Sequence, residues 1–267
     1  MTLTGYTVPR TPSGRASLVP APPWHYVGDF LVIDFHADPE AAVSLLPEGI
    51  APHPDPGRAA IVFADWQSCS EDGDELVDPS RSQYRECYLV VSGELDGEPV
   101  TTCPFIWVDQ DFALARGWIQ GFPKKLGDVW MTRSFAAACR AAAPVAPGGR
   151  FGATCSAHGR RLVDAEIALE QVSPGGSVHT DPPLVNVRYF PQLAAGAHDR
   201  PAVHELVRAR SRDRVVSEVW EGSARLELFP APGEEHTLLA PVSVERGYRF
   251  TFAYTVDDLE TVRDYRR

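Results

Sequence analysis

Strand-length runs of alternating or wholly apolar residues, separated by turn residues, dominate this sequence. The sharpest signal lies at 84–108, where two such runs flank Asp96-Gly97, a dipeptide typical of a two-residue β-hairpin. The other strand patterns cover residues 28–36, 59–69, 128–136, 150–156, 162–171, 183–189, 215–229 and 248–256. Many strands with few helical segments predict an α+β fold that is mainly antiparallel β.

Helix signals are short and few. Asp38 followed by Pro39 predicts a helix start, with Asp as the N-cap and Pro at the first helical position. Residues 109–121 have room for one more short helix. Asp257 predicts the cap of a last helix over 258–266.

Three segments carry weaker signals. Residues 1–24 are rich in proline and predict an extended N-terminal arm, either disordered or lying across a neighbouring subunit. Residues 70–81 are acidic and predict a loop, whereas the Ala-rich stretch 137–146 leaves a helix or a strand extension open. Because no repeat or shift in composition marks a boundary, we expect residues 1–267 to form a single domain.

Net charge and composition exclude several classes of partner. A formal charge of −11 repels nucleic acid and anionic membrane surfaces. We see neither an apolar run long enough to span a bilayer nor a signal peptide, so we expect a cytoplasmic protein. The five cysteines form no CxxC and the eight histidines show no ligand spacing, which predicts no metal site.

Lysine occurs at only two positions, the consecutive residues Lys124 and Lys125, among 25 basic residues. Arginine stays protonated, whereas a neutral lysine attacks carbonyl carbons. A second ammonium close by favours the neutral amine, because like charges repel. The pair after Phe122-Pro123 therefore predicts a Schiff-base nucleophile, and the alternative is a surface turn in an arginine-biased protein.

Two further residues are candidates for acid–base chemistry. Glu86 lies in a strand that otherwise reads as buried, and alternation places it on one face with Tyr84 and Tyr88. Tyr254 lies on a late strand, where its phenol can move a proton or orient a substrate. The alternatives are a Glu86 that points to solvent or pairs with Arg85 or Arg81, and a Tyr254 that serves only in the core.

The segment Gly121-Phe-Pro-Lys-Lys-Leu-Gly127 resembles the acetoacetate decarboxylase family, whose hallmark is an aromatic-Pro-Lys-Lys-Leu-Gly turn. The similarity extends to the helical segment 38–48, to Tyr84-Arg85-Glu86 and to the strand pattern 218–229. It therefore spans nearly the whole chain, and the lysine turn is its most specific part.

The resemblance implies a fold, an assembly and residue roles. The fold would be a cone-like β-barrel with flanking helices, assembled as a homo-oligomer. Lys124 would form the imine, Lys125 would be its cationic neighbour, and Glu86 would lie near the reacting carbon. Acetoacetate decarboxylase is itself the standard example of a lysine activated by a cationic neighbour, so these roles follow from the likeness. No cofactor is implied, because the covalent imine supplies the chemistry.

Three positions depart from the family pattern. Decarboxylases carry Gly-Arg-Glu where this chain has Arg116-Gly117-Trp118, an arginine near Gly28, and a second glutamate near Ala64. The groups credited with handling the departing carboxylate are thus depleted, while the imine lysine is kept.

We therefore predict a lyase that condenses a small 2-oxo acid such as pyruvate with an aldehyde and then eliminates water. Tyr254 or Glu86 is the general acid for that elimination. The predicted substrate-binding residues are Arg116, Gln120, Phe122 and Trp118. The alternatives are a decarboxylase of a β-keto acid and a non-catalytic barrel that binds small molecules.

Overall fold

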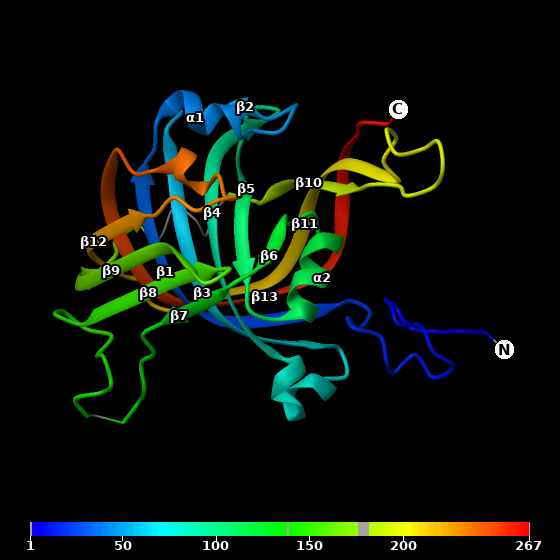
Figure 1. The fold of residues 1–267 in the computed structure, drawn as a ribbon. Coiled ribbons are helices and arrows are strands. Elements are labelled where there is room, and N and C mark those ends of the chain that lie inside the picture. Colours follow the sequence, from blue (N-terminus) through cyan, green and yellow to red (C-terminus); the bar gives the residue numbers. More distant parts are fainter. Residues whose placement is uncertain (1, 138, 176–181, 267) are drawn as a thin grey trace.

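Figure 1 shows a computed structural model that describes residues 2–137, 139–175 and 182–266. The strands are β1 (Trp24–His36), β2 (Ala51–Pro52), β3 (Arg58–Ser70), β4 (Gln83–Leu95), β5 (Glu98–Val108), β6 (Lys124–Leu126), β7 (Asp128–Met131), β8 (Arg150–Ala157), β9 (Arg160–Val172), β10 (Val185–Phe190), β11 (Val203–Val216), β12 (Trp220–Leu228) and β13 (Ser243–Asp264). The helices are α1 (Pro39–Ser44), α2 (Asp111–Ile119) and the short 3-10 turns η1 (Asp74–Val77), η2 (Pro79–Arg81) and η4 (His236–Leu239). One mixed but mainly antiparallel sheet dominates, which confirms the predicted fold class.

The sheet wraps so that its two ends meet at one turn. Its hydrogen-bonded path runs β6-β5-β4-β3-β1-β13-β12-β9-β8-β7, and only the β5–β6 pairing is parallel along it. The first and last strands of this path, β6 and β7, are separated in the chain by Gly127 alone. A Cβ at Gly127 would lie 2.9 Å from the Ser156 carbonyl oxygen and 3.0 Å from Trp107 Cβ, so the connection between β6 and β7 leaves no room for a side chain. The result is the cone-like wrap that the resemblance implied.

Both faces of the central strands are buried. Leu31, Phe63 and Leu89 belong to one apolar cluster, whereas Phe30 and Trp66 belong to a second cluster on the opposite face. Alternate residues of β1, β3 and β4 therefore enter different cores, which explains why these strands read as nearly continuous apolar runs. We call the second cluster the site core, because it surrounds the candidate site.

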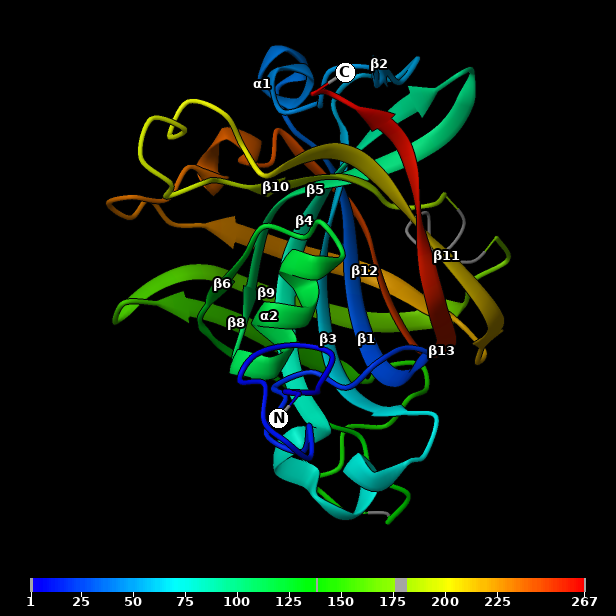
Figure 2. The same ribbon diagram turned by 90° about the vertical axis from the view of Figure 1, so that its right-hand side faces the viewer.

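Helix α2 lies across the site core, between β5 and β6 in the chain. Figure 2 shows α2 in front of the strands, with the N-terminal arm below it. Its buried residues are Phe112, Ala113, Arg116 and Gly117, which share one side of the helix. Because α2 leads directly into β6, it sets the position of the lysine turn.

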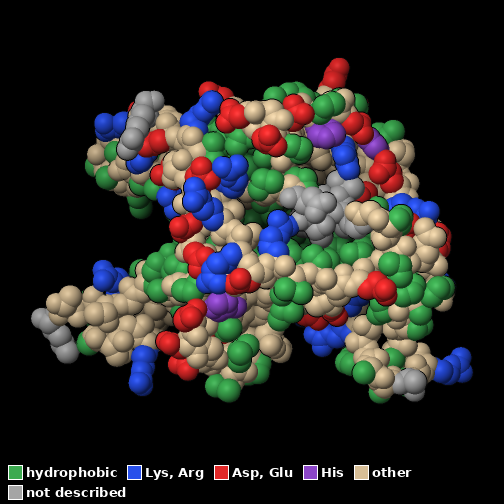
Figure 3. All heavy atoms as spheres, turned by 180° about the vertical axis from the view of Figure 1, so that it is seen from behind, with side chains coloured by type: hydrophobic (Ala, Val, Ile, Leu, Met, Phe, Trp, Pro, Cys, Tyr) green, Lys and Arg blue, Asp and Glu red, His purple; other side chains and the backbone are tan. Residues whose placement is uncertain are grey.

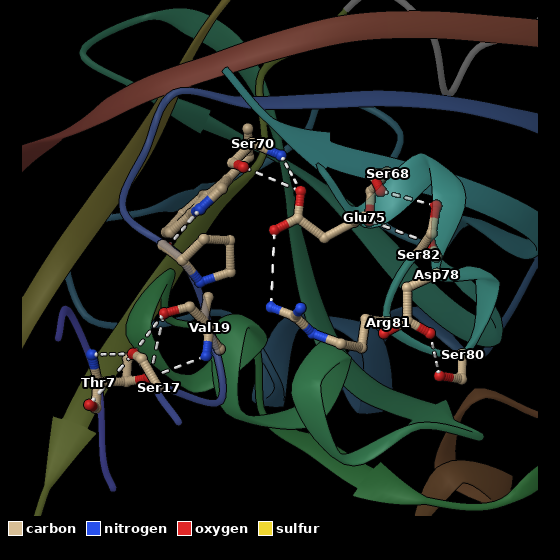
Figure 4. Close-up of polar contacts among 12 residues, drawn as sticks. Thr7, Ser17, Val19, Ser68, Ser70, Glu75, Asp78, Ser80, Arg81 and Ser82 are labelled. Carbon is tan, nitrogen blue, oxygen red and sulfur yellow. Dashed lines mark hydrogen bonds and ion pairs between the residues drawn. The ribbon is translucent and has the colours of Figure 1, made fainter. Parts of the chain in front are cut away.

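The N-terminal arm lies against its own chain. Thr4 pairs with Thr11, and the Thr7 amide donates to Ser17 Oγ at 2.8 Å. Val19 is fully buried in the site core. Figure 4 shows the contacts of Thr7, Ser17 and Val19 beside the connection between β3 and β4, where Glu75 accepts from Ser70.

The prediction of a last helix over 258–266 is wrong, because β13 continues as a strand to Asp264. Residues of β11 pair with this stretch, and the Arg208 guanidinium donates to Glu260 at 2.8 Å. Cross-strand partners far away in the sequence thus override the local cap signal.

Three other predictions need smaller corrections. The strand at 128–136 ends at Met131, and the run 215–229 divides between the end of β11 and β12. Residues 137–146, apart from the undescribed position 138, contain neither helix nor strand. Proline and glycine follow closely at 144–149, which limits regular structure there.

The described surface is charged and mixed. Acidic and basic side chains are interspersed on the face seen in Figure 3. Among the described residues, none of the helices is long and apolar enough to cross a membrane.

Candidate active site

Side chains of the site core form rows across four adjacent strands, because paired residues of antiparallel strands point to the same face. Taken in the order β13, β1, β3 and β4, the rows are Tyr254–Tyr26–Ser68–Ser82, Phe252–Gly28–Trp66–Tyr84 and Phe250–Phe30–Ala64–Glu86. The first row differs at its end, because Ser82 precedes β4 and is joined to Ser68 by a backbone hydrogen bond instead of strand pairing. Glu86 thus faces the site core, as its alternation with Tyr84 and Tyr88 predicted.

The lysine turn follows directly from the way α2 ends. Gly121 adopts φ +85°, and the Phe122 amide donates to Gly117 O while the Gly121 amide donates to Trp118 O. These two bonds form a Schellman motif, which requires a residue such as glycine at the left-handed position. The chain then reverses into β6, where Lys124 pairs with Ile106 of β5.

Gly117 gives Lys124 its path into the site. A Cβ at this position would lie 2.3 Å from Lys124 Cδ, so the lysine stem passes directly over the helix backbone. On the other side, the Trp118 indole donates to the Lys124 carbonyl at 2.8 Å. The backbone and stem of Lys124 are therefore fixed before any substrate binds.

Lys124 and Glu86 form a buried ion pair. The Lys124 ammonium lies 2.8 Å from Glu86 Oε2, and each side chain is 8% exposed. The Trp66 indole donates to the other carboxylate oxygen, Glu86 Oε1, at 2.7 Å. A carboxylate in hydrogen-bond contact with an ammonium is placed to take its proton and release a nucleophilic amine.

Arg116 is a second buried cation in the same chamber, 4% exposed. Its guanidinium carbon lies 4.7 Å from the ring centre of Tyr26 and 5.4 Å from that of Tyr84. Its Nη2 donates to Ser68 Oγ at 3.0 Å. Within the described part of the chain, no carboxylate lies at ion-pair distance from Arg116. A buried guanidinium without an acidic partner is costly unless an anion joins it.

Ser68 is held in turn by the β3–β4 connection. Ser68 Oγ donates to the Ser82 carbonyl at 3.2 Å, and Ser82 Oγ donates to the Ser68 carbonyl at 2.9 Å. Figure 4 shows this reciprocal pair. The link fixes the hydroxyl that orients Arg116.

The phenols that surround these charges are protonated at neutral pH. Burial raises the pKa of Tyr26, and it raises the pKa of Tyr84, Tyr88 and Tyr254 well above the usual value. Each phenol can therefore donate a hydrogen bond. Gln120 Nε2 donates to the Tyr26 hydroxyl at 3.4 Å.

Two adjoining hollows contain these groups. An inner chamber of about 40 Å³ is lined by Lys124, Glu86, Arg116 and the aromatic residues around them. An outer chamber of about 110 Å³ lies next to it, and the residues lining both are Trp66, Tyr88, Gln120, Phe122, Leu184 and Tyr254. A larger hollow of about 610 Å³, over β7, β8 and β9, contains none of the predicted site residues.

The structure brings six of the eight predicted site residues to these chambers and places Lys125 and Trp118 elsewhere. The Lys125 ammonium lies 2.7 Å from Glu234 Oε2 on the opposite side of β6, because consecutive strand residues point to opposite faces. Lys125 is therefore not the immediate cationic neighbour of Lys124, and Arg116 is the second cation of the chamber. Trp118 is 48% exposed and contacts the lysine backbone instead of the chamber.

Sequence reasoning missed Trp66, Tyr26 and Ser68. Their strands are apolar on both faces, so periodicity does not distinguish the face that carries the site. Trp66 lies two residues after Ala64 in β3 and therefore on the same face. This alternation indicates the site only once the register between β3 and β4 is known, because that register pairs Ala64 with Glu86. Among the described residues no group of three or more His, Cys, Asp or Glu side chains that could hold a metal ion occurs.

Comparison with known proteins identifies the family. The sequence model described as acetoacetate decarboxylase matches residues 7–266. The chain belongs to the acetoacetate decarboxylase family. A comparison with curated proteins finds no match.

Solved structures of the family extend this result. The enduracididine biosynthesis enzyme MppR is 37% identical, with a TM-score of 0.93, and the alignment covers 99% of this chain and 98% of MppR. That MppR structure holds the condensation product of pyruvate and imidazole 4-carboxaldehyde, and another holds pyruvate. An acetoacetate decarboxylase-like enzyme from Sphingomonas wittichii RW1 is 26% identical over 98% of this chain and 100% of its own, with a TM-score of 0.89.

A true acetoacetate decarboxylase, that of Legionella pneumophila, shares the fold at greater distance. It is 19% identical, with a TM-score of 0.76 over 93% of this chain and 90% of its own. The family is one of enzymes, and this chain has the fold and the lysine turn of that family.

Proposed function

We propose that this protein is a lysine Schiff-base lyase that joins pyruvate, or a similar small 2-oxo acid, to an aldehyde and then eliminates water. The observation that carries the proposal is the buried guanidinium of Arg116 in the chamber of Lys124 and Glu86, which has no carboxylate at ion-pair distance among the described residues. These three groups carry two positive charges and one negative charge, which leaves the chamber short of one anion. The carboxylate of a 2-oxo acid supplies that anion, and its keto carbon then lies within the chamber that contains the amine.

The first steps form the imine. Glu86 takes a proton from the Lys124 ammonium, and the free amine attacks the keto carbon to form a C–N bond. The carbinolamine hydroxyl leaves as water after it receives a proton, which gives the iminium. Because the iminium nitrogen withdraws electrons, the methyl group becomes acidic, and Glu86 takes one of its protons to leave the enamine.

The next steps make and break bonds to the aldehyde. The enamine carbon attacks the aldehyde carbon, and the aldehyde oxygen takes a proton. Glu86, which has passed its proton to the aldehyde oxygen, takes a second proton from the former methyl carbon. The new hydroxyl departs as water with a proton from the general acid Tyr254, which regains a proton from Glu86. Hydrolysis of the iminium returns Lys124 and releases a 2-oxo-3-enoic acid, so one molecule of water is lost overall.

The outer chamber is the proposed site for the aldehyde. It adjoins the inner chamber along Gln120 and Tyr254, which line both chambers. Phe30, Phe122 and Phe252 contribute much of its apolar wall. Tyr254 lines both chambers and carries its phenol proton at neutral pH, so it is placed to hydrogen-bond the departing hydroxyl and to give it a proton as the C–O bond breaks.

The pyruvate complexes of MppR support this proposal, since that protein is 37% identical and aligns along nearly its whole length. The alternative of β-keto acid decarboxylation has less support. At Gly28, where decarboxylases carry arginine, the Trp66 ring occupies the space over the backbone. Glu86 is the sole carboxylate among the described residues that line the inner chamber.

The test is product formation with pyruvate and a panel of aldehydes. A conjugated 2-oxo-3-enoic acid absorbs in the near ultraviolet, so absorbance should grow with time and depend on both substrates. Lys124→Arg should abolish the growth, because guanidinium does not form the imine at useful rates. No absorbance growth with any aldehyde of a broad panel contradicts the proposed reaction.

A further inference from the structure

Glu86 is held by two donors, one on each carboxylate oxygen. Lys124 Nζ contacts Oε2 at 2.8 Å and the Trp66 indole contacts Oε1 at 2.7 Å. Trp66 is itself 3% exposed, so water competes little for this bond. An indole nitrogen is a donor only, and its ring plane fixes the direction of its single N–H. The carboxylate is thus oriented from the side opposite the lysine.

The two donors differ once the reaction begins. The ammonium of Lys124 has three N–H groups, but an imine formed on the same nitrogen has at most one, and that one lies in the imine plane. The contact between Lys124 and Glu86 therefore changes as soon as the substrate is bound covalently. The bond from Trp66 to Glu86 Oε1 involves neither the lysine nitrogen nor a substrate atom, so imine formation does not remove its donor or its acceptor.

Gly28 provides the space for this indole. It lies between Phe252 and Trp66 in the row across the strands and is the one member of that row without a side chain. A Cβ at Gly28 would lie 2.6 Å from Trp66 Cε3, closer than real atoms approach. Four other rings hold the indole: Phe30 at 4.8 Å, Tyr254 at 5.7 Å, Tyr26 at 5.8 Å and Tyr84 at 6.3 Å between ring centres.

We propose that Trp66 is a positioning residue that keeps Glu86 Oε2 directed at the imine after Lys124 has reacted, and that Gly28 is required to seat it. This inference rests on the proposed function, because it concerns the carboxylate that takes the methyl proton of the iminium. Trp66 acts through Glu86 and not on the substrate. Its loss should therefore slow proton transfer while the imine still forms.

The experiment separates these two steps. Exchange of the pyruvate methyl protons for solvent deuterium, followed by proton NMR in D₂O, reports enamine formation. Borohydride reduction followed by peptide mass spectrometry reports the imine on Lys124. For Trp66→Phe we expect the adduct at the wild-type level and methyl exchange slowed by about tenfold or more, since general acid–base catalysis typically contributes about 10²- to 10⁴-fold.

Two further variants protect the test against loss of folding. Substituting 3-benzothienylalanine at Trp66 keeps the two-ring outline and replaces only the N–H by sulfur, and it should slow exchange as Trp66→Phe does. Gly28→Ala displaces the ring and should also slow exchange. Trp107→Phe is the matched control, because Trp107 is another fully buried indole that donates to a glutamate, Glu234, in the opposite core.

The outcomes are distinct. Wild-type exchange in the benzothienylalanine variant overturns the proposal, and so does equal slowing in Trp107→Phe, which assigns the loss to general destabilisation. Loss of the adduct in a folded Trp66→Phe protein also overturns it, because Trp66 then acts on imine formation. If the wild-type protein itself gives no adduct, the proposed function fails instead.

Discussion

The side chains of Lys124 and Lys125 leave β6 in opposite directions and end in separate ion pairs, with Glu86 and Glu234 respectively. The first pair is buried in the inner chamber. The second joins β6 to the segment before η4, with Glu234 4% exposed and Lys125 48% exposed. Two identical neighbours in the sequence thus have different surroundings, and their replacement should have different consequences.

Lys125→Gln should leave imine formation intact and lower stability. Glu234 loses its cation while it stays buried, which costs about 1–3 kcal/mol. The measurement combines borohydride trapping with denaturant unfolding. The double variant Lys125→Gln with Glu234→Gln removes the stranded charge and should recover part of the stability. Loss of the pyruvate adduct in folded Lys125→Gln would contradict the separation of the two lysines.

Arg116→Met should weaken the use of 2-oxo acids by removing the partner of their carboxylate. A hydrogen bond to a charged group contributes about 1.5–3 kcal/mol, so kcat/KM for pyruvate should fall by about 10- to 150-fold. Arg116→Lys should restore little, because an ammonium lacks the planar fork that packs between Tyr26 and Tyr84. Acetone has no carboxylate, and its trapping on Lys124 should change much less. Equal loss with both ketones would assign Arg116 a structural role.

Tyr254→Phe should keep the pyruvate imine and slow formation of the conjugated product. Removal of a general acid typically costs about 10²- to 10⁴-fold in rate, so the absorbance assay should detect the change easily. Tyr248→Phe is a suitable control, since Tyr248 lies on the same strand and lines neither chamber. An unchanged rate in Tyr254→Phe removes that residue from its proposed role and leaves the lysine chemistry standing.

Gly117→Ala should block Lys124 although it favours the helix. Alanine in place of glycine within a helix stabilises it by about 1 kcal/mol when nothing else changes. Here the new methyl group collides with the lysine stem, at 2.3 Å from Cδ. We expect a folded protein with retained α2 whose borohydride adduct with pyruvate is strongly reduced. Full trapping in this variant would show that the stem has another path.

Acetoacetate should be a poor substrate for decarboxylation. By the resemblance seen in the sequence, Gly28, Ala64 and Trp118 stand where the family's decarboxylases would carry charged groups. Each preorganised polar group typically contributes about 10²-fold or more to the rate. Carbon dioxide release from acetoacetate should therefore be far slower than condensation with pyruvate. Release at a rate equal to that of the condensation would favour the decarboxylase alternative.

Homo-oligomer formation, the absence of a cofactor and a cytoplasmic location stay predictions. Native mass spectrometry of the purified protein measures the first two together, because it gives both the subunit number and any bound mass. We expect more than one subunit and a subunit mass that the sequence alone explains.

The sequence predicted the fold class and both members of the buried Lys124–Glu86 ion pair, but not the residue that orients Glu86. Glu86 could be found because β4 alternates around it, and Lys124 because lysine is so rare in this chain. Trp66 could not be found, since its contact with Glu86 depends on the register between β3 and β4. Such a register is fixed by the whole sheet and leaves no local pattern.

The errors have a common physical origin. The cap signal at Asp257 favours a helix, yet pairing with β11 keeps residues to Asp264 in a strand. The prediction that Lys125 is the cationic neighbour of Lys124 treats the motif as a turn, whereas its second half is the strand β6, in which consecutive side chains point to opposite faces. In both cases long-range strand pairing decided the local conformation.

Borohydride reduction of the protein in the presence of pyruvate tests the central claim most directly. Peptide mass spectrometry should locate a reduced N-(1-carboxyethyl) adduct on Lys124, and this adduct should be absent from Lys124→Arg and present in Lys125→Gln. An adduct on Lys125, or none in the wild-type protein with any 2-oxo acid of a broad panel, would contradict the account.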